Sequence, residues 1–149
     1  MTRGDPAMFP SERCHATCVA IHGHAVLLEG PPGAGKSDLA LRLIDRGAIL
    51  VSDDQTLMVR DGAMVLARAP ATIRGQIEVR GLGIVSMTSI DDVPVALIVR
   101  LDGEPLRMPE RQRRRLAGIE VREIALDAFH AATPLKIEWA LRQPEATPE

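Results

Sequence analysis

The sequence predicts an α/β fold in which a mixed sheet with few helices carries a phosphate-binding loop. Short apolar runs typical of strands outnumber helical patterns along the 149 residues, a length close to that of one ordinary domain. Turn-forming residues join several of these runs directly, which indicates antiparallel neighbours and not a regular strand–helix–strand repeat. A glycine-rich loop also connects one apolar run to an amphipathic helix, as in proteins that bind phosphate at a helix N-terminus.

The order of the elements follows from the apolar runs and the turn signals between them. Strands are expected over residues 16–21, 25–29, 48–52, 93–101 and 118–126, a hairpin over 56–68 with Asp61-Gly62 at its turn, and a strand edge with a functional loop over 75–85. Helices are expected over 37–47 and 134–142, with Leu135 and Trp139 one turn apart in the second. The polar stretch 103–115 is expected to be a mobile loop.

The first helix has an apolar face and a stop signal. Leu39, Ala40, Leu43 and Ile44 recur at helical spacing on one face, and Gly47 occupies the position of a C-cap glycine. These residues predict a short helix with one buried side.

Composition and charge narrow the class of protein. Apolar residues make up 46% and charged residues 26%, the balance of a soluble globular protein. The net charge of −2 argues against a dedicated nucleic-acid or membrane-surface protein, and no apolar run approaches the ~20 residues of a membrane span. Because the N-terminus lacks an apolar signal core, we expect a cytoplasmic protein, with a loose tail at 1–13, one domain at 14–143 and a second tail at 144–149.

Cys14 and Cys18, with His15 and His22 nearby, raise the question of a zinc site. Structural zinc sites usually combine two closely spaced pairs of ligands, and a second pair is missing here. A spacing of four places both thiols on the same side of a strand. We therefore expect reduced, partly buried thiols.

The loop "GPPGAGKS" matches the pattern G-x-x-x-x-G-K-[ST], and its context fits, because it follows an apolar strand and opens a helix. Glycines let backbone N–H groups turn toward phosphate oxygens, and the helix N-terminus adds partial positive charge. The lysine can reach the β- and γ-phosphates, and the serine can ligate Mg²⁺. The residues expected to bind nucleoside triphosphate are Gly30, Pro31, Pro32, Gly33, Ala34, Gly35, Lys36 and Ser37.

Two adjacent carboxylates follow the next strand. Asp53 and Asp54 end the run "LVSDD", and we expect this strand to run beside the strand of the loop, so that both carboxylates lie at the phosphate end. Adjacent aspartates can divide their work, one toward the metal and one toward the acceptor hydroxyl. His15 precedes the first expected strand, and near Asp54 it could tune the protonation of that carboxyl group.

Several of these motifs, taken together, resemble a known protein family. His15, the loop "GPPGAGKS", the run "LVSDD" and the stretch "IEVRGLGIV" resemble the C-terminal catalytic domain of HPr kinase/phosphorylase, in order and spacing, over roughly residues 15–99. The family signature E-[IV]-R-G-[LI]-G-I corresponds here to Glu78, Val79, Arg80, Gly81, Leu82, Gly83 and Ile84.

The resemblance implies an enzyme with two activities. With ATP and Mg²⁺ it phosphorylates a serine of the phosphocarrier HPr or of its nitrogen-system relative, and with inorganic phosphate it removes that phosphate as pyrophosphate. It also implies a P-loop fold similar to that of phosphoenolpyruvate carboxykinase, and an oligomer, which is a hexamer in the family.

The resemblance also implies roles for single residues. Asp54 acts as base toward the serine hydroxyl and as acid in reverse, with His15 near it. Ser37, Asp38 and Asp53 lie near the metal. Glu78, Arg80, Gly81 and Gly83 belong to the signature tied mainly to dephosphorylation.

The chain departs from the family pattern in several places. Full-length members carry an N-terminal domain, and the chain resembles a short form found in some α-proteobacteria. Its loop reads "PPGAG" where a serine is expected before the second glycine, Asp38 stands where glutamate is common, and the similarity fades beyond Val99.

Two questions stay open from sequence. The run Arg111, Arg113, Arg114 and Arg115 fits a solvated helix face, or a lid or partner-docking element in which Arg111 reaches the site. The function itself has an alternative, a regulatory module that binds ATP and contacts signalling proteins with little catalysis. A pure sensor has no need of Asp54, and a small-molecule kinase would need a substrate pocket for which no segment is large enough.

Overall fold

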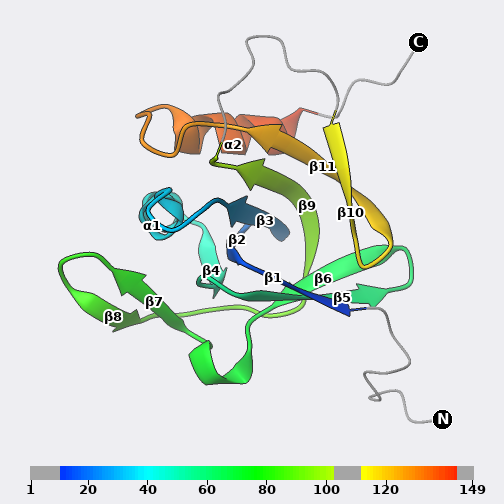
Figure 1. Cartoon of the computed structure of the whole chain (residues 1–149), viewed down its shortest axis with the longest axis horizontal. Coiled ribbons are helices and arrows are strands. Elements are labelled where there is room, and N and C mark those ends of the chain that lie inside the picture. Colours follow the sequence, from blue (N-terminus) through cyan, green and yellow to red (C-terminus); the bar gives the residue numbers. More distant parts are fainter. Residues whose placement is uncertain (1–10, 103–111, 144–149) are drawn as a thin grey trace.

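The computed structural model describes residues 11–102 and 112–143, and these form one curled mixed sheet, a separate hairpin and two α-helices (Figure 1). The elements are β1 (Ser11–Cys14), β2 (Ala16–Ile21), β3 (His24–Glu29), α1 (Lys36–Asp45), β4 (Ile49–Ser52), β5 (Thr56–Asp61), β6 (Met64–Arg68), a short 3-10 helix (Ala71–Ile73), β7 (Gln76–Val79), β8 (Gly83–Ser86), β9 (Val93–Arg100), β10 (Gln112–Leu116), β11 (Ile119–Ala125) and α2 (Thr133–Arg142). The expected α/β class, with strands dominating over few helices, is confirmed.

The strand order places β9 at the centre of the sheet. The sheet runs β1-β5-β6-β9-β3-β2-β4, and β11 pairs with β9 while β10 pairs with β11. The pairs β3–β9 and β9–β11 are parallel, and the other pairs of this sheet are antiparallel. The hairpin β7–β8 stands apart from the main sheet (Figure 1).

Both faces of the central strands are buried, which explains why β2 and β3 read as unbroken apolar runs. Alternate residues point to opposite faces, so the strands supply two cores. One core includes Cys18, Leu27 and Ile98 and lies inside the curl formed with β5, β6, β10 and β11. The other core, made by Val19, Leu28, Val99 and the residues they contact, receives the apolar sides of α1 and α2.

Helix α1 has the face and the end that its sequence predicts. Leu39, Ala40 and Leu43 are buried, and Ile44 packs against the same cluster. Gly47 has φ of 111°, and its N–H donates to the carbonyl of Ile44 while that of Ala48 donates to Leu43, which is a glycine C-cap. In α2, Leu135 and Trp139 lie on the exposed side, and Ile137 is buried.

Three expectations about elements need correction. Residues 11–13 belong to β1, which pairs with β5, so the tail expected at 1–13 is too long; 1–10 and 144–149 lie outside the described residues. The polar loop expected at 103–115 includes part of a strand, β10, because the backbone of residues 112–116 pairs with β11. Strand β4 does not lie beside β3, because β2 lies between them.

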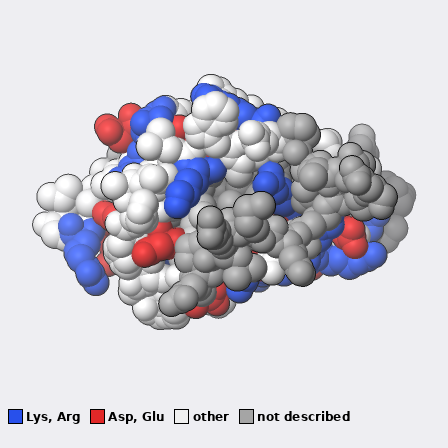
Figure 2. Space-filling view, turned by 90° about the horizontal axis from the view of Figure 1, so that it is seen from above, with Lys and Arg blue, Asp and Glu red and all other residues white. Residues whose placement is uncertain are grey.

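Charge is mixed over the face seen from above. In Figure 2 the described basic and acidic side chains of that face lie interspersed and do not gather into one large basic area. No helix among the described residues is both long enough and apolar enough to cross a membrane.

Candidate functional site

The P-loop connects the carboxyl end of β3 to the N-terminus of α1. Lys36 is the first residue of the helix, and its Nζ donates a 2.6 Å hydrogen bond to the carbonyl of Gly30, the first residue of the loop. A Cβ on Gly30 would lie 2.7 Å from the Cβ of Ala34, and Gly35 has φ of 93°, so this tight turn needs glycine at both positions. The loop therefore has the form of an anion-binding cradle at a helix N-terminus.

Asp53 is held at the foot of this cradle by three donors. Its Oδ1 accepts from Ser37 Oγ at 2.7 Å and from Thr17 Oγ1 at 3.0 Å, and its Oδ2 accepts from the backbone N–H of Glu78 at 2.9 Å. The residue is 9% exposed. Strands β3 and β4 run in the same direction because both are antiparallel to β2, so their carboxyl ends meet at one edge of the sheet. The expected convergence of Asp53 with the loop is therefore present, although its strand is not adjacent.

Asp54 follows Asp53 in a left-handed backbone conformation. Its φ is 66°, a value uncommon among non-glycine residues, although aspartate adopts it more often than most. Its backbone N–H donates to Thr17 Oγ1 at 3.1 Å, so one hydroxyl contacts both aspartates. The Asp54 side chain is exposed and lines the same cavity as the P-loop.

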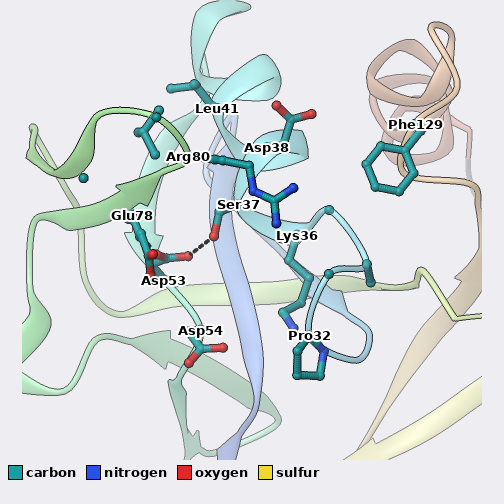
Figure 3. A pocket seen from close by; sticks show the side chains of 16 residues that line it. Pro32, Lys36, Ser37, Asp38, Leu41, Asp53, Asp54, Glu78, Arg80 and Phe129 are labelled. Carbon is teal, nitrogen blue, oxygen red and sulfur yellow. Dashed lines mark hydrogen bonds between the residues drawn. The ribbon is translucent and has the colours of Figure 1, made fainter.

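The β7–β8 hairpin brings the signature residues to the other side of the cavity. Glu78 lies on β7, while Arg80 and Gly81 lie in the turn that joins it to β8. Glu78, Arg80, Gly81 and Gly83 all line the cavity. Figure 3 shows the Arg80 guanidinium extending toward Lys36 and Asp38, and Glu78 lying beside Asp53.

These parts enclose one open cavity of about 790 Å³, within the range of small-molecule sites. Of the expected site residues, it brings together Lys36, Ser37, Asp53, Asp54 and Arg80 (Figure 3). The P-loop residues Pro32, Gly33, Ala34 and Gly35 also line it, and Phe129 joins from the segment before α2.

Two further expected site residues, His15 and Asp38, differ in how they relate to this cavity. His15 is exposed in the bend between β1 and β2 and is not among the residues that line the cavity. Asp38 lines the cavity, but its carboxylate pairs with Arg42 one turn along the helix at 3.2 Å. Arg111 lies outside the described residues.

The two cysteines lie in the inner core. Cys18 is fully buried, Cys14 packs against the same cluster, and both are free thiols. Burial, followed by the nearby carboxylates of Glu29 and Glu12, raises the pKa of the Cys14 thiol to about 11. Burial also raises the pKa of the Cys18 thiol well above its ordinary value. Partly buried thiols were expected on the same side of one strand, but Cys14 lies on β1 and Cys18 on β2, with the bend at His15 between them, and Cys18 is fully buried.

A charge cluster of Glu29, Arg100, Arg114 and Glu123 includes the residue that immediately precedes the P-loop, Glu29. The guanidinium of Arg114 donates to both carboxylate oxygens of Glu29, at 2.5 and 3.0 Å, and to Glu123 at 3.1 Å. Arg100 pairs with the same Glu123 at 2.6 Å. Burial lowers the pKa of Arg114, but its hydrogen bonds to the two glutamates outweigh this and leave it above the ordinary value. Arg114 therefore belongs to a strand and an ion cluster, and the helix-face interpretation of this run is wrong.

Sequence reasoning missed Thr17, Phe129 and the pairing of Arg114. A signal existed for Thr17, because a threonine inside a fully buried strand must find hydrogen-bond partners. No local pattern pointed to Phe129 or to the partner of Arg114, since their neighbours in the site lie far away in sequence.

The donor set fits a nucleoside triphosphate with Mg²⁺. Mg²⁺ takes oxygen ligands, usually one or two from the protein and the rest from phosphates and water. Ser37 Oγ and Asp53 Oδ1 lie 2.7 Å apart at the foot of the cradle and offer such oxygens. Lys36 supplies a cation for phosphate oxygens, and Asp54 supplies a carboxylate that can take a proton.

Comparisons with known proteins point to one family. Residues 7–93 match the family described as HPr Serine kinase C-terminal domain. The chain is 36% identical over 130 residues to the HPr kinase/phosphorylase of Burkholderia lata, covering 78% of this chain and 40% of that protein. It is 40% identical over 76 residues to that of Mycoplasmopsis pulmonis, covering 51% and 25%.

A solved structure extends the likeness beyond the matched sequence. The HPr(Ser) kinase/phosphatase from Coxiella burnetii superposes with a TM-score of 0.76 at 28% identity, covering 88% of this chain and 94% of that one. In length, this chain spans between a quarter and two fifths of the curated relatives described above.

Proposed function

The chain belongs to the family of the HPr Serine kinase C-terminal domain, and from this we propose that it is an ATP-dependent protein serine kinase acting on a phosphocarrier of the HPr type or its nitrogen-system relative. The observation that carries the proposal is the geometry around Asp53. One carboxylate connects the P-loop serine, the buried Thr17 and the signature hairpin, and Asp54 stands next to it in the same cavity.

Each residue has a defined part in the proposed reaction. The P-loop N–H groups and Lys36 hold the phosphates of ATP, and Lys36 exchanges its bond to the Gly30 carbonyl for phosphate oxygens. Ser37 and Asp53 would hold Mg²⁺, which when bound neutralises charge on the transferred phosphoryl group. Asp54 accepts the proton of the acceptor serine as its oxygen forms the new bond to the γ-phosphorus, and the bond to ADP breaks.

The reverse activity is part of the proposal. An oxygen of inorganic phosphate bonds to the phosphorus of the phosphoseryl group, the bond from that phosphorus to the serine oxygen breaks, Asp54 returns a proton to the serine oxygen, and pyrophosphate is the product. Arg80 extends into the cavity and is suited to hold the attacking phosphate bidentately. A cytoplasmic location, an oligomeric assembly and a P-loop fold like that of phosphoenolpyruvate carboxykinase belong to the same proposal.

The direct test incubates the protein with γ-labelled ATP, Mg²⁺ and each purified HPr-type carrier, and measures label on serine. We expect transfer to at least one carrier. Asp54→Asn should bind ATP normally while transfer falls by about 10²- to 10⁴-fold, because an amide cannot take the proton. Binding of ATP without transfer to any carrier would favour the regulatory sensor.

A second variant, Lys36→Ala, tests the nucleotide-binding part of the proposal. This variant should lose most of its ATP affinity in calorimetry, because the β- and γ-phosphates lose their direct cation. Unchanged affinity would show that the P-loop does not hold the triphosphate.

A further inference from the structure

Phe129 places an exposed aromatic ring against the P-loop. It follows β11, lines the same cavity as Lys36 and Ser37, and is 68% exposed. A Cβ built on Gly35 would lie 3.0 Å from two of its ring carbons, Cε1 and Cζ, so the ring edge touches the end of the cradle. Figure 3 shows the ring across the P-loop from Asp53 and Glu78.

The backbone under this ring is fixed on both sides. The N–H of Phe129 donates to Asp127 Oδ1 at 2.9 Å, and the Arg42 guanidinium donates to the carbonyls of Ala128 and His130. Ala128 is 1% exposed and belongs to the core under α1. The ring is therefore apolar and open to solvent, yet mounted on a rigid segment tied to the P-loop helix, which is how a preorganised ligand contact is built.

The chain is poor in aromatic residues. It has two phenylalanines, one tryptophan and no tyrosine. Phe9 lies outside the described residues, and Trp139 lies on the exposed side of α2, where Arg142 stacks over it. Among the described residues, Phe129 alone brings such a ring to the phosphate cavity.

The P-loop accounts for the phosphates of a nucleoside triphosphate but leaves its ribose and base to the rest of the 790 Å³ cavity. A base needs a flat apolar contact, and an aromatic side chain provides one for any base, since every base has a π-face. We propose that Phe129 is the platform on which the base of the bound nucleotide stacks. The inference rests on the proposed function, and it specifies how the site holds the end of the nucleotide remote from the transferred phosphate.

The platform has a consequence for selectivity. Stacking does not read the hydrogen-bonding edge of a base, so this contact favours purines by their larger surface and separates adenine from guanine weakly. Affinities for ATP and GTP should therefore fall together when the ring is removed.

The test measures the dissociation constants of ATP, GTP and inorganic tripolyphosphate by calorimetry with Mg²⁺, on the whole chain. Phe129→Ala should weaken both nucleotides by about 5- to 150-fold, the loss expected for one stacked base, and leave tripolyphosphate within twofold. Leu135→Ala is the matched control, because Leu135 is an exposed apolar side chain that does not line the cavity, and it should change none of the three.

A second variant gives a spectroscopic readout. Phe129→Trp in a Trp139→Phe background keeps a flat ring, so ATP affinity should persist, and the indole fluorescence should be quenched by ATP but not by tripolyphosphate. Equal weakening of nucleotides and tripolyphosphate by Phe129→Ala would make the ring a structural support of the P-loop and overturn the inference. Unchanged nucleotide affinity would overturn it as well.

The outcomes separate this inference from the proposed function. Wild-type protein that binds neither ATP nor tripolyphosphate overturns the kinase proposal and the platform together. Wild-type protein that binds both, with Phe129→Ala leaving ATP affinity intact, overturns the platform alone.

Discussion

One hydroxyl group, that of Thr17, serves both aspartates of the site. It donates to Asp53 Oδ1 at 3.0 Å and accepts from the Asp54 N–H at 3.1 Å, and the residue is fully buried. Thr17→Val keeps the shape but leaves that N–H without this acceptor. We expect a loss of ~1–3 kcal/mol in the free energy of unfolding, together with slower transfer, measured by urea denaturation and by initial rates.

Thr17→Ser is the rescue for this experiment. Serine keeps the hydroxyl and loses only a methyl group, so most of the activity should return. A valine variant with wild-type stability and rate would mean that the two hydrogen bonds contribute nothing to the site.

Arg80 offers a test of direction. In the turn of the β7–β8 hairpin its side chain lines the cavity, where an attacking inorganic phosphate needs a cation. Arg80→Ala should reduce phosphate-dependent dephosphorylation of the phosphoseryl carrier more than phosphorylation by ATP, because phosphorylation involves no free phosphate. Both rates and the melting temperature should be measured on one preparation. Equal losses in the two directions would contradict the directional role.

Site residues that belong to a local sequence pattern were predicted, and those without such a pattern were missed. The P-loop and the pair Asp53-Asp54 can be identified from the sequence, because their spacing alone defines them. Arg80 lies in the turn just after the strand that carries Glu78, since Gly81 and Gly83 both have positive φ and close the hairpin. His15 was expected near Asp54 by resemblance; it lies exposed in the bend between β1 and β2 and is not among the residues that line the cavity.

Strand β10 contributes an arginine to the ion cluster next to the start of the P-loop. Glu29 is the last residue of β3 and precedes the loop, and Arg114 on β10 pairs with it. Arg114→Met would leave the Glu29 carboxylate unpaired beside the phosphate site. We expect ATP to bind about 2- to 10-fold more weakly, because the carboxylate that immediately precedes the P-loop is then left without its counter-charge. Calorimetry at low and high salt checks this.

The second substitution isolates the charge. Adding Glu29→Gln to Arg114→Met removes the unpaired carboxylate, so the affinity for ATP should recover, and the defect of the single variant should shrink as salt rises. Failure of the double variant to recover would assign the effect to the packing of β10.

Strand β10 also shows why the run of arginines was wrongly predicted to be a solvated helix face. Four arginines close together normally indicate a solvated segment. On β10, however, alternation directs Arg114 to Glu29 and Glu123, while Arg113 and Arg115 are exposed. The partners come from β3 and β11, and only the assembled sheet identifies them.

For the whole molecule, the two thiols make stability depend on pH in the alkaline range. Burial, with Glu29 and Glu12, raises the pKa of Cys14 from its ordinary 9.0 to about 11, and burial also raises the pKa of Cys18. The folded state therefore prefers the protonated thiols. Their contribution to stability is complete below pH 9 and is lost as the pH rises toward 11.

Urea midpoints under reducing conditions should be flat from pH 7.5 to 8.5 and fall by pH 9.5 and above. A Cys14→Ser, Cys18→Ala double variant should show a smaller fall over the same range. Identical slopes in the two proteins would exclude the thiols as the cause.

The central position of β9 has a consequence for how this chain is made. Ribosomes release β2 and β3 early and β9 much later, yet β9 is the strand that joins β3 to β6 and, through β11, to β10. Until β9 emerges, the nascent chain carries two half-sheets with open, apolar edges, a form prone to wrong pairing and aggregation. The P-loop, the two aspartates and the signature hairpin are complete in sequence by Gly83, but both Phe129 and the strand that holds β3 in place follow later. Synthesis of this protein thus passes through an interval in which the phosphate end of the site has been translated but not yet folded, and chaperones that shield strand edges should matter most there.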